Sequence, residues 1–163
     1  ESATCLGLMY FMQEGTPFIY QGQEIGMTNV EFDSIEDYND VKTKNNYYIG
    51  LEEGHSHEEL IKNAWRFSRD NSRTPMQWND SIYGGFSEHK PWINSNPNYK
   101  TINVESQLND KNSILNFYKN MIKIRKANEA LVYGEYKLIL ENDKNIYAYE
   151  RILENVNLKI LTI

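Results

Sequence analysis

Hydrophobic residues are continuous near the start of the chain and become periodic later. Residues 3–12 are apolar nearly all round, which predicts a helix buried on most of its sides. Gly15 followed by Thr16-Pro17 ends that helix, because glycine takes the left-handed position and proline cannot continue it. The short apolar run 18–20 then predicts a buried strand of the parallel type, so the chain is expected to begin within an α/β fold.

Polar residues dominate the next part of the chain, from 27 to 57, which predicts a long functional excursion after the strand. Apolar residues at helical spacing then predict a helix over 58–67. Residues 74–107 are rich in proline, glycine and asparagine. They are expected to form an ordered loop in which Trp78 and Trp92 are packing anchors.

The last third of the chain changes from a helical to a strand pattern. Apolar residues three and four apart predict a helix over about 112–128. Alternating residues predict strands around 136–140 and 146–150, joined by a turn at 142–145. A third apolar run, 158–163, reaches the last residue without a turn, so both ends are interpreted as cuts through a longer fold.

Composition excludes more classes of function than it selects. The 163 residues are 40% hydrophobic, enough for one domain or parts of two. A net charge of −6 argues against a nucleic-acid partner. No apolar run approaches the roughly 20 residues that cross a bilayer. Cys5 is the single cysteine, which excludes an intramolecular disulfide and suits a reducing compartment.

Several common types of site are not supported by the residues. His55 and His57 are two apart and cannot share a helix face, so a metal site is rejected there. No G-x-S-x-G motif is present, and Cys5 lies in an apolar helix where its thiol stays protonated. Gly84 and Gly85 lack the strand-to-helix context of a phosphate loop. The sequence therefore predicts no metal and no cofactor.

One polar segment remains as candidate chemistry: residues 67–78, which contain Arg69, Asp70 and Arg73. Two arginines around an aspartate, on a loop that ends in proline, fit a structural ion-pair cluster. Alternatively, one guanidinium presents its fork of donors to a sugar hydroxyl or to a catalytic carboxylate. The residues alone leave both interpretations open.

Longer motifs together resemble glycoside hydrolase family 13. Residues 15–26, GTPFIYQGQEIG, resemble the last barrel strand of that family. Residues 68–78, SRDNSRTPMQW, resemble the signature of its oligo-1,6-glucosidase branch. Four shorter motifs fit the same branch in the same order: Pro91-Trp92, Asn96 to Tyr99, Ile102 to Val104 and Asn112 to Tyr118. The resemblance covers essentially the whole chain.

The resemblance implies an α/β fold class, a (β/α)₈ TIM barrel followed by an antiparallel β domain. On that pattern residues 1–129 are the C-terminal portion of the catalytic barrel. They hold helix seven at 1–14, strand eight at 16–21 and helix eight at 112–128. Residues 130–163 are then the first strands of the C-terminal all-β domain.

The resemblance also implies a chemistry whose central residues lie elsewhere. Retaining members use an Asp nucleophile, a Glu acid/base and a second Asp, on the ends of barrel strands that precede residue 1. The resemblance therefore assigns no catalytic residue to this chain, and neither Glu24 nor Asp70 matches one. The chain by itself is predicted to be inactive.

Substrate-binding residues carry over individually from the resemblance. Arg69 matches the arginine that reaches the glucose unit at the non-reducing end, where a planar donor fork suits a hydroxyl beside a carboxylate. Asp70, Arg73 and Gln77 are assigned to holding the Arg69 loop. Lys42 stands where relatives commonly carry a glutamate that lines the leaving-sugar site, so it is a second candidate contact and reverses the local charge.

The implied activity is that of a cytoplasmic, exo-acting α-glucosidase that cleaves α-1,6-linked glucose from short, isomaltose-like oligosaccharides. Its expected partners are the oligosaccharide substrate and the rest of the parent barrel, without nucleic acid or membrane. Activity on trehalose-6-phosphate, dextran or sucrose, or a trehalose- or sucrose-isomerising activity, stays open within the family. A non-catalytic sugar-binding or purely structural module is the alternative of another class.

Overall fold

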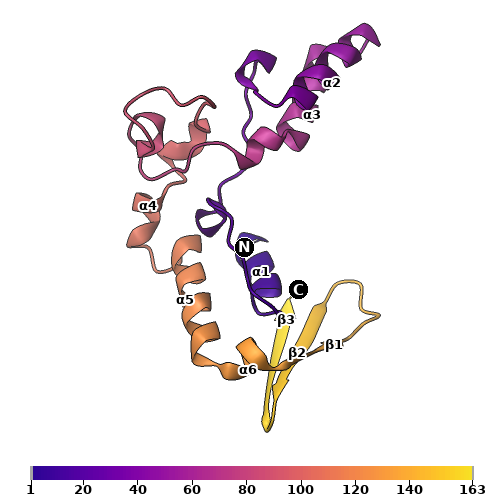
Figure 1. Cartoon of the computed structure of the whole chain (residues 1–163), viewed down its shortest axis with the longest axis vertical. Coiled ribbons are helices and arrows are strands. Elements are labelled where there is room, and N and C mark those ends of the chain that lie inside the picture. Colours follow the sequence, from indigo (N-terminus) through magenta and orange to yellow (C-terminus); the bar gives the residue numbers. More distant parts are fainter. Residues whose placement is uncertain (1, 163) are drawn as a thin grey trace. The chain divides into compact units, whose positions relative to one another are not determined.

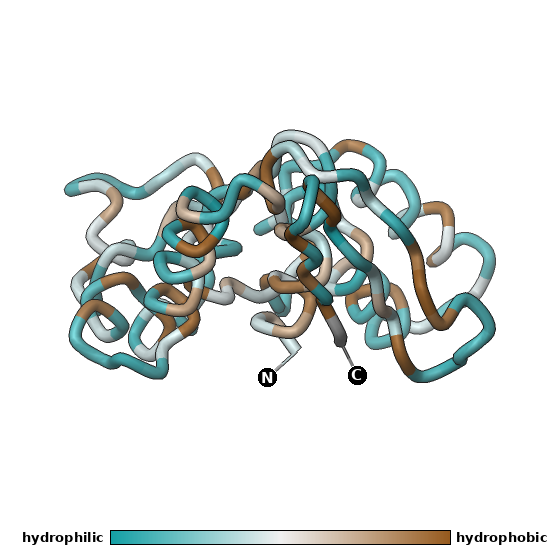
Figure 2. Tube along the Cα trace, turned by 90° about the horizontal axis from the view of Figure 1, so that it is seen from below, coloured by the Kyte–Doolittle hydropathy of each residue, from teal (hydrophilic) through white to brown (hydrophobic). Residues whose placement is uncertain are grey.

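A computed structural model describes residues 2–162 of the chain (Figure 1). They form two compact units, one combining the residues up to Gly26 with those from Gln107 onward, the other comprising Met27–Ser106. Each unit has its own hydrophobic core. Hydrophobic stretches are spread over both units (Figure 2), and among the described residues no helix has the length and apolar character to cross a membrane.

The first unit packs helices against a three-stranded antiparallel sheet. Tyr149 and Ile160, which lie opposite each other in the sheet, share a core with Phe11 and Tyr118 from two of the helices. The elements are α1 (Ser2–Phe11), η1 (Gln23–Ile25), α5 (Ile114–Ala127), α6 (Glu129–Tyr133), and the strands β1 (Glu135–Ile139), β2 (Tyr147–Leu153) and β3 (Val156–Thr162), in the order β1-β2-β3.

Two buried arginines attach the end of α1 to the rest of this unit. Arg125 comes from α5 and Arg151 from β2, and within residues 2–162 the hydrogen bonds of both guanidinium groups go to backbone carbonyls. The acceptors, at 2.6–3.0 Å, are Phe11, Gln13 and Gly15 for Arg125, and Met12, Leu131 and Gly134 for Arg151. Burial lowers the pKa of both guanidinium groups, but arginine stays charged, so the pair satisfies carbonyls that the helix end leaves unpaired.

The predictions for this unit hold for the helix and the sheet but not for the first segment. The expected helix over 112–128 is α5, capped by Ser113, and the two strands with their turn are β1 and β2. The segment predicted as a strand, 16–21, forms none here, and Phe18 is 83% exposed. A parallel strand needs a neighbour to accept and donate its backbone hydrogen bonds, and no strand within residues 2–162 supplies one.

The prediction that the helix over 3–12 is buried on most of its sides is wrong for the described residues. Within α1 only Gly7 and Phe11 are buried, and Leu6 is 54% exposed. Ile163, the last residue of the third predicted apolar run, lies outside the described residues.

The second unit is built around a helical hairpin and a series of short 3₁₀ turns. Its core comprises residues of both helices together with Val30, Tyr38 and Ile93, which are at most 1% exposed. The elements are η2 (Ile35–Asp37), α2 (Val41–Glu52), α3 (His57–Phe67), η3 (Arg69–Ser72), η4 (Ile82–Gly85) and η5 (Pro97–Lys100), with α4 (Val104–Leu108) following.

The helix α3 confirms the prediction made from its apolar spacing, whereas α2 lies in the segment predicted as a polar excursion. Only Tyr47 and Gly50 of α2 are buried, so the helix has almost no hydrophobic period to read. Gly50 allows the close approach of α3, because a Cβ at that position would collide with the Leu60 side chain. The contact between α2 and α3 therefore depends on a glycine, and α2 lacks the row of apolar residues by which a packed helix is usually predicted.

The prediction that Trp78 and Trp92 anchor the 74–107 loop is wrong. Their side chains are 50% and 74% exposed. The loop is held instead by the buried Met76, Gln77 and Ile93, and by polar contacts. The two tryptophans of this loop therefore lie at the surface, and smaller side chains are buried in their place.

Candidate substrate-binding site

The helix α2 begins at a buried aspartate. Asp40 precedes the first turn in an extended conformation, and its Oδ2 accepts from the backbone N–H of Thr43 at 3.3 Å and from the Thr43 hydroxyl at 2.8 Å. A carboxylate at this position also faces the positive end of the helix dipole. The Asp40 side chain is 2% exposed, so it is fixed from two sides.

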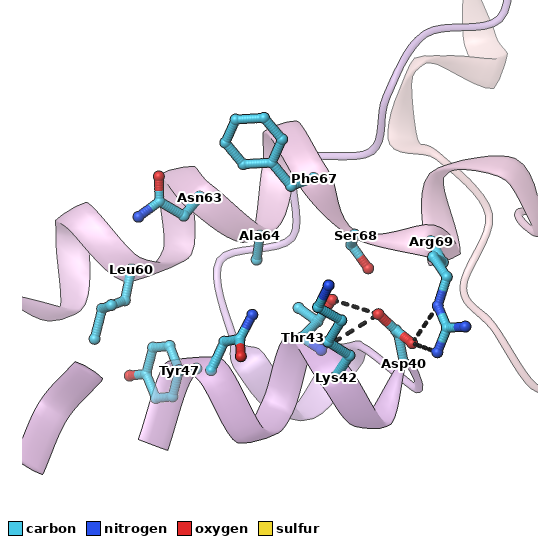
Figure 3. A pocket seen from close by; sticks show the side chains of 11 residues that line it. Asp40, Lys42, Thr43, Tyr47, Leu60, Asn63, Ala64, Phe67, Ser68 and Arg69 are labelled. Atoms are coloured by element: carbon cyan, nitrogen blue, oxygen red, sulfur yellow. Dashed lines mark hydrogen bonds and ion pairs between the residues drawn. The ribbon is translucent and has the colours of Figure 1, made fainter. Parts of the chain in front are cut away.

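Arg69, at the start of η3, bonds to the other oxygen of the same carboxylate. Its Nε and Nη2 donate to Asp40 Oδ1 at 3.0 and 2.7 Å (Figure 3). Although Asp40 is buried, the Arg69 side chain is 62% exposed. Within residues 2–162 the Arg69 Nη1 has no hydrogen-bond partner, so one edge of the guanidinium is held and the other is available to a ligand.

The charges of this pair reinforce each other. Burial alone raises the pKa of Asp40, but the hydrogen bonds from Arg69 and Thr43 and the charge of Arg69 outweigh it and lower that pKa to about 2. The hydrogen bond to Asp40, followed by its charge, raises the pKa of Arg69. Both groups are therefore ionised at neutral pH, and the arginine is held as a cation.

Asp70 follows Arg69 in the chain and is completely buried. Its Oδ2 accepts from the backbone N–H groups of Asn39 and Asp40 at 2.6 and 2.9 Å. Its Oδ1 lies 3.6 Å from Nη1 of Arg73, an ion pair between a buried carboxylate and a half-exposed cation. Asp70 thus connects η3 to the residues that lead into α2, and fixes where Asp40 and Arg69 meet.

Gln77 contacts a different part of the unit. Its Nε2 donates to Asn98 Oδ1 at 3.1 Å and to the carbonyl of Ile102, and its backbone carbonyl accepts from Val104 at 3.0 Å. These bonds join the end of the arginine motif to the 96–104 segment. The assigned roles of Asp70, Arg73 and Gln77 as supports of the Arg69 loop are compatible with these contacts and stay a prediction.

A groove of about 570 Å³ runs between α2 and α3 and ends at the Arg69–Asp40 pair (Figure 3). We refer to it as the α2–α3 groove. Its lining residues are Asp40, Lys42, Thr43, Asn46, Tyr47, Leu60, Asn63, Ala64, Phe67, Ser68 and Arg69. The structure therefore places both predicted substrate contacts, Lys42 and Arg69, on one groove, while Asp70, Arg73 and Gln77 do not line it.

His55 and His57 lie where α2 is connected to α3. Tyr47 OH and His57 Nδ1 are 2.6 Å apart, and His55 Nδ1 lies 3.2 Å from Glu59 Oε2. Across residues 2–162 no group of three His, Cys, Asp or Glu side chains has the arrangement of a metal site. His55 and His57 thus each have a local partner that accounts for their positions.

Sequence reasoning missed Asp40, the residue that holds Arg69. The sequence does contain a signal for it. An aspartate at a helix N-cap accepts a hydrogen bond from the backbone N–H three residues later, and Thr43 stands at that distance from Asp40. The signal was not used because α2 itself was not predicted. Without α2, nothing in the sequence indicates that Asp40 lies close to Arg69.

Comparison with known proteins identifies the family. Residues 1–134 match the alpha-amylase family, specifically its catalytic domain. The chain belongs to the alpha-amylase family. The predicted membership of glycoside hydrolase family 13 is therefore confirmed.

Relatives within the alpha-amylase family are similar over almost the whole chain. The chain is 56% identical over 151 residues to a probable oligo-1,6-glucosidase 3 of Bacillus subtilis, covering 93% of this chain and 27% of that protein. It is 51% identical over 163 residues to an oligo-1,6-glucosidase of Parageobacillus thermoglucosidasius, covering 99% and 29%. A crystal structure of trehalose-6-phosphate hydrolase from Bacillus licheniformis superposes with a TM-score of 0.94 at 45% identity, covering 98% of this chain and 29% of that one.

The chain thus spans less than a third of the length of the alpha-amylase-family relatives that it matches. The predicted fold class, the C-terminal part of a TIM barrel followed by an antiparallel sheet, is confirmed by the family match and by the superposition. The likeness to the oligo-1,6-glucosidase branch is confirmed in the same way.

Proposed function

We propose that this chain is the substrate-binding, C-terminal barrel portion of a retaining exo-α-glucosidase that hydrolyses α-1,6-glucosidic bonds of short oligosaccharides. The observation that carries the proposal is the Arg69 guanidinium, held on one edge by buried Asp40 and open on the other at the end of a groove. The identity of 56% and 51% to two proteins named oligo-1,6-glucosidases supports the substrate class.

In this proposal the chain binds and orients the sugar, and the reacting carboxylates come from elsewhere in the enzyme. Retaining hydrolysis uses a nucleophilic carboxylate and a second carboxyl group that acts first as acid and then as base. Arg69 donates to a hydroxyl of the terminal glucose, and its held geometry limits the positions that the sugar ring can take. Fixing a substrate in this way contributes to the rate because the reacting atoms start near their productive arrangement.

A second candidate activity is the hydrolysis of a phosphorylated disaccharide, and Lys42 favours it. Lys42 lines the α2–α3 groove, and within the described residues no carboxylate lies at ion-pair distance from its ammonium group. An unpaired cation beside the leaving-sugar position attracts a phosphate that a glutamate would repel. The superposition on a trehalose-6-phosphate hydrolase is compatible with this candidate.

The proposal places the enzyme in the cytoplasm, since Cys5 is the single cysteine of the chain and suits a reducing compartment. The partners in this proposal are the oligosaccharide substrate and the rest of the parent barrel. The non-catalytic alternative, a sugar-binding or structural module, predicts that sugar binding survives while hydrolysis is absent.

The test uses the full-length enzyme that contains this chain, with isomaltose, trehalose-6-phosphate and sucrose as substrates. We expect kcat/KM to be highest for isomaltose and to fall about 100-fold in Arg69→Ala, with little change in melting temperature. Lys62→Ala is the control, because Lys62 is an exposed cation of α3 that does not line the groove. Absence of hydrolysis of any α-glucoside would contradict the proposed function.

A further inference from the structure

The α2–α3 groove has an apolar floor and polar walls. Tyr47, Leu60 and Ala64 on its floor are buried, at 9% exposure or less. Asn46 from α2 and Asn63 from α3 are both exposed and stand on opposite helices. The groove therefore offers two carboxamide groups above a hydrophobic surface.

This combination matches the chemistry of a pyranose ring. A sugar hydroxyl is both donor and acceptor, and so is a carboxamide, which can satisfy one hydroxyl in either sense. The C–H face of the ring is apolar and suits the Leu60 and Ala64 surface. Phe67, 73% exposed at the rim, adds an aromatic side chain with a large apolar face.

The size of the groove also fits a bound sugar. Its volume of about 570 Å³ lies within the range of roughly 300–1,000 Å³ that is typical of small-molecule sites, which are mostly apolar with a few polar groups. The carboxylate of the groove, Asp40, is already bonded to Arg69 and Thr43. Beyond that pair the groove is lined by one cation, Lys42, and further along by the neutral carboxamides of Asn46 and Asn63, so the part next to the carboxamides suits a neutral unit.

The groove is continuous with the proposed glucose contact, because Arg69 and Asp40 form one of its ends. We propose that Asn46 and Asn63 extend the leaving-sugar site beyond Lys42 along the α2–α3 groove, and that they bind a neutral pyranose unit of the leaving part of the oligosaccharide. This inference rests on the proposed function, since it takes Arg69 as the contact to the terminal glucose. It assigns to Asn46 and Asn63 the selection of substrates by chain length.

The test compares substrates with and without the additional sugar units in the full-length enzyme. The variants are Asn46→Leu and Asn63→Leu, which keep the side-chain size and remove the hydrogen-bonding groups. The matched control is Asn45→Leu, because Asn45 is an exposed asparagine of the same helix that does not line the groove. The substrates are isomaltotriose and a p-nitrophenyl α-glucoside, which carries only one glucose unit.

We expect each groove variant to lower kcat/KM for isomaltotriose by about five- to tenfold, the effect of one lost hydrogen bond. The value for the aryl glucoside and all values for Asn45→Leu should stay within about twofold of the unsubstituted enzyme. An equal effect on both substrates, or no effect on either, would overturn the inference. A fall in melting temperature with unchanged kinetics would also overturn it, since it would show that another part of the protein fills the groove.

A binding measurement separates this inference from the proposed function. Titration calorimetry with a thio-linked isomaltotriose, which is not hydrolysed, reports affinity whether or not the enzyme turns over a glucoside. Weaker binding in Asn46→Leu and Asn63→Leu but not in Asn45→Leu supports the groove subsite even if hydrolysis fails. Unchanged binding in all three variants rejects the subsite even if the enzyme proves to be an oligo-1,6-glucosidase.

Discussion

Nε and Nη2 of Arg69 both donate to a single oxygen of Asp40, while the other oxygen of that carboxylate caps α2 through Thr43. The two oxygens thus have separate tasks, one toward the helix and one toward the guanidinium. Asp40 is 2% exposed and Arg69 is 62% exposed, so a buried anion positions an accessible cation.

Asp40→Asn should reduce activity more than stability. Asparagine caps a helix about as well as aspartate, so α2 keeps its first turn. The carboxamide cannot hold the guanidinium as an anion does, and we expect kcat/KM of the full-length enzyme to fall about 10- to 100-fold. Asp33→Asn removes an exposed carboxylate of the same unit and serves as control. A stability loss with near-normal kcat/KM would instead assign Asp40 to the fold alone.

The effect of Asp40→Asn should not depend on pH in the neutral range. The pKa of Asp40 in the folded protein is about 2, lowered from an ordinary value of 3.8, so its contribution is fully present above the ordinary value and is lost as pH falls toward 2. The ratio of kcat/KM between the unsubstituted enzyme and Asp40→Asn should therefore be flat from about pH 5 to about pH 8. Kinetic pH profiles of both proteins measure it, and a slope in that window contradicts a permanently ionised pair.

The sequence predicts Arg69 and the helices α3 and α5, but it does not predict α2 or the role of Asp40. Arg69 was found because it lies in a specific motif, and α3 and α5 because their apolar residues recur at helical spacing. α2 was missed because its burial is concentrated on Tyr47 and Gly50, and a glycine contact leaves no hydrophobic period. The exposure of Trp78 and Trp92 was also unpredictable, since residue type alone does not show what covers a side chain.

Lys42→Glu tests which substrate the leaving-sugar side prefers. Lys42 is exposed on the α2–α3 groove, and the substitution reverses its charge beside the Arg69–Asp40 pair. We expect the preference for trehalose-6-phosphate over isomaltose, measured as a kcat/KM ratio, to fall about fivefold at low ionic strength and less at high salt. Lys62→Glu makes the same change in net charge on α3 outside the groove. An unchanged ratio at low salt would show that Lys42 does not select the substrate.

Asp70→Ala should destabilise the protein, in contrast to Arg69→Ala. The substitution leaves the backbone N–H groups of Asn39 and of the buried Asp40 without their acceptor, which costs about 3 kcal/mol. Arg73→Ala should cost less, because Arg73 is half-exposed and lies 3.6 Å from the carboxylate. Melting temperatures of the full-length variants, with the exposed Asp80→Ala as reference, measure the difference. Equal melting temperatures for Asp70→Ala and Asp80→Ala would contradict a supporting role.

Arg151→Met should destabilise the first unit by about 3 kcal/mol or more, because three buried carbonyls lose their donor at once. The methionine keeps much of the side-chain volume, so the loss reports hydrogen bonding more than packing. Lys137→Met, an exposed site on β1, is the reference in thermal melting experiments. If Arg151→Met melted like that reference, the guanidinium contacts would contribute little.

The arginines that hold the end of α1 also determine which changes this region can accept. Arg125 and Arg151 contact only main-chain oxygens there, so they are indifferent to the side chains of the residues that carry those oxygens. A substitution that keeps the main chain in place therefore keeps these contacts, but at Phe11 and Met12 it also changes the core, and at Gly15, with a φ of 102°, it strains the backbone. Adding or deleting one residue is different, because it turns the helix by about 100° and shifts it by about 1.5 Å, which moves every acceptor at once. These contacts therefore depend on the length of the segment that ends α1 more than on its side chains.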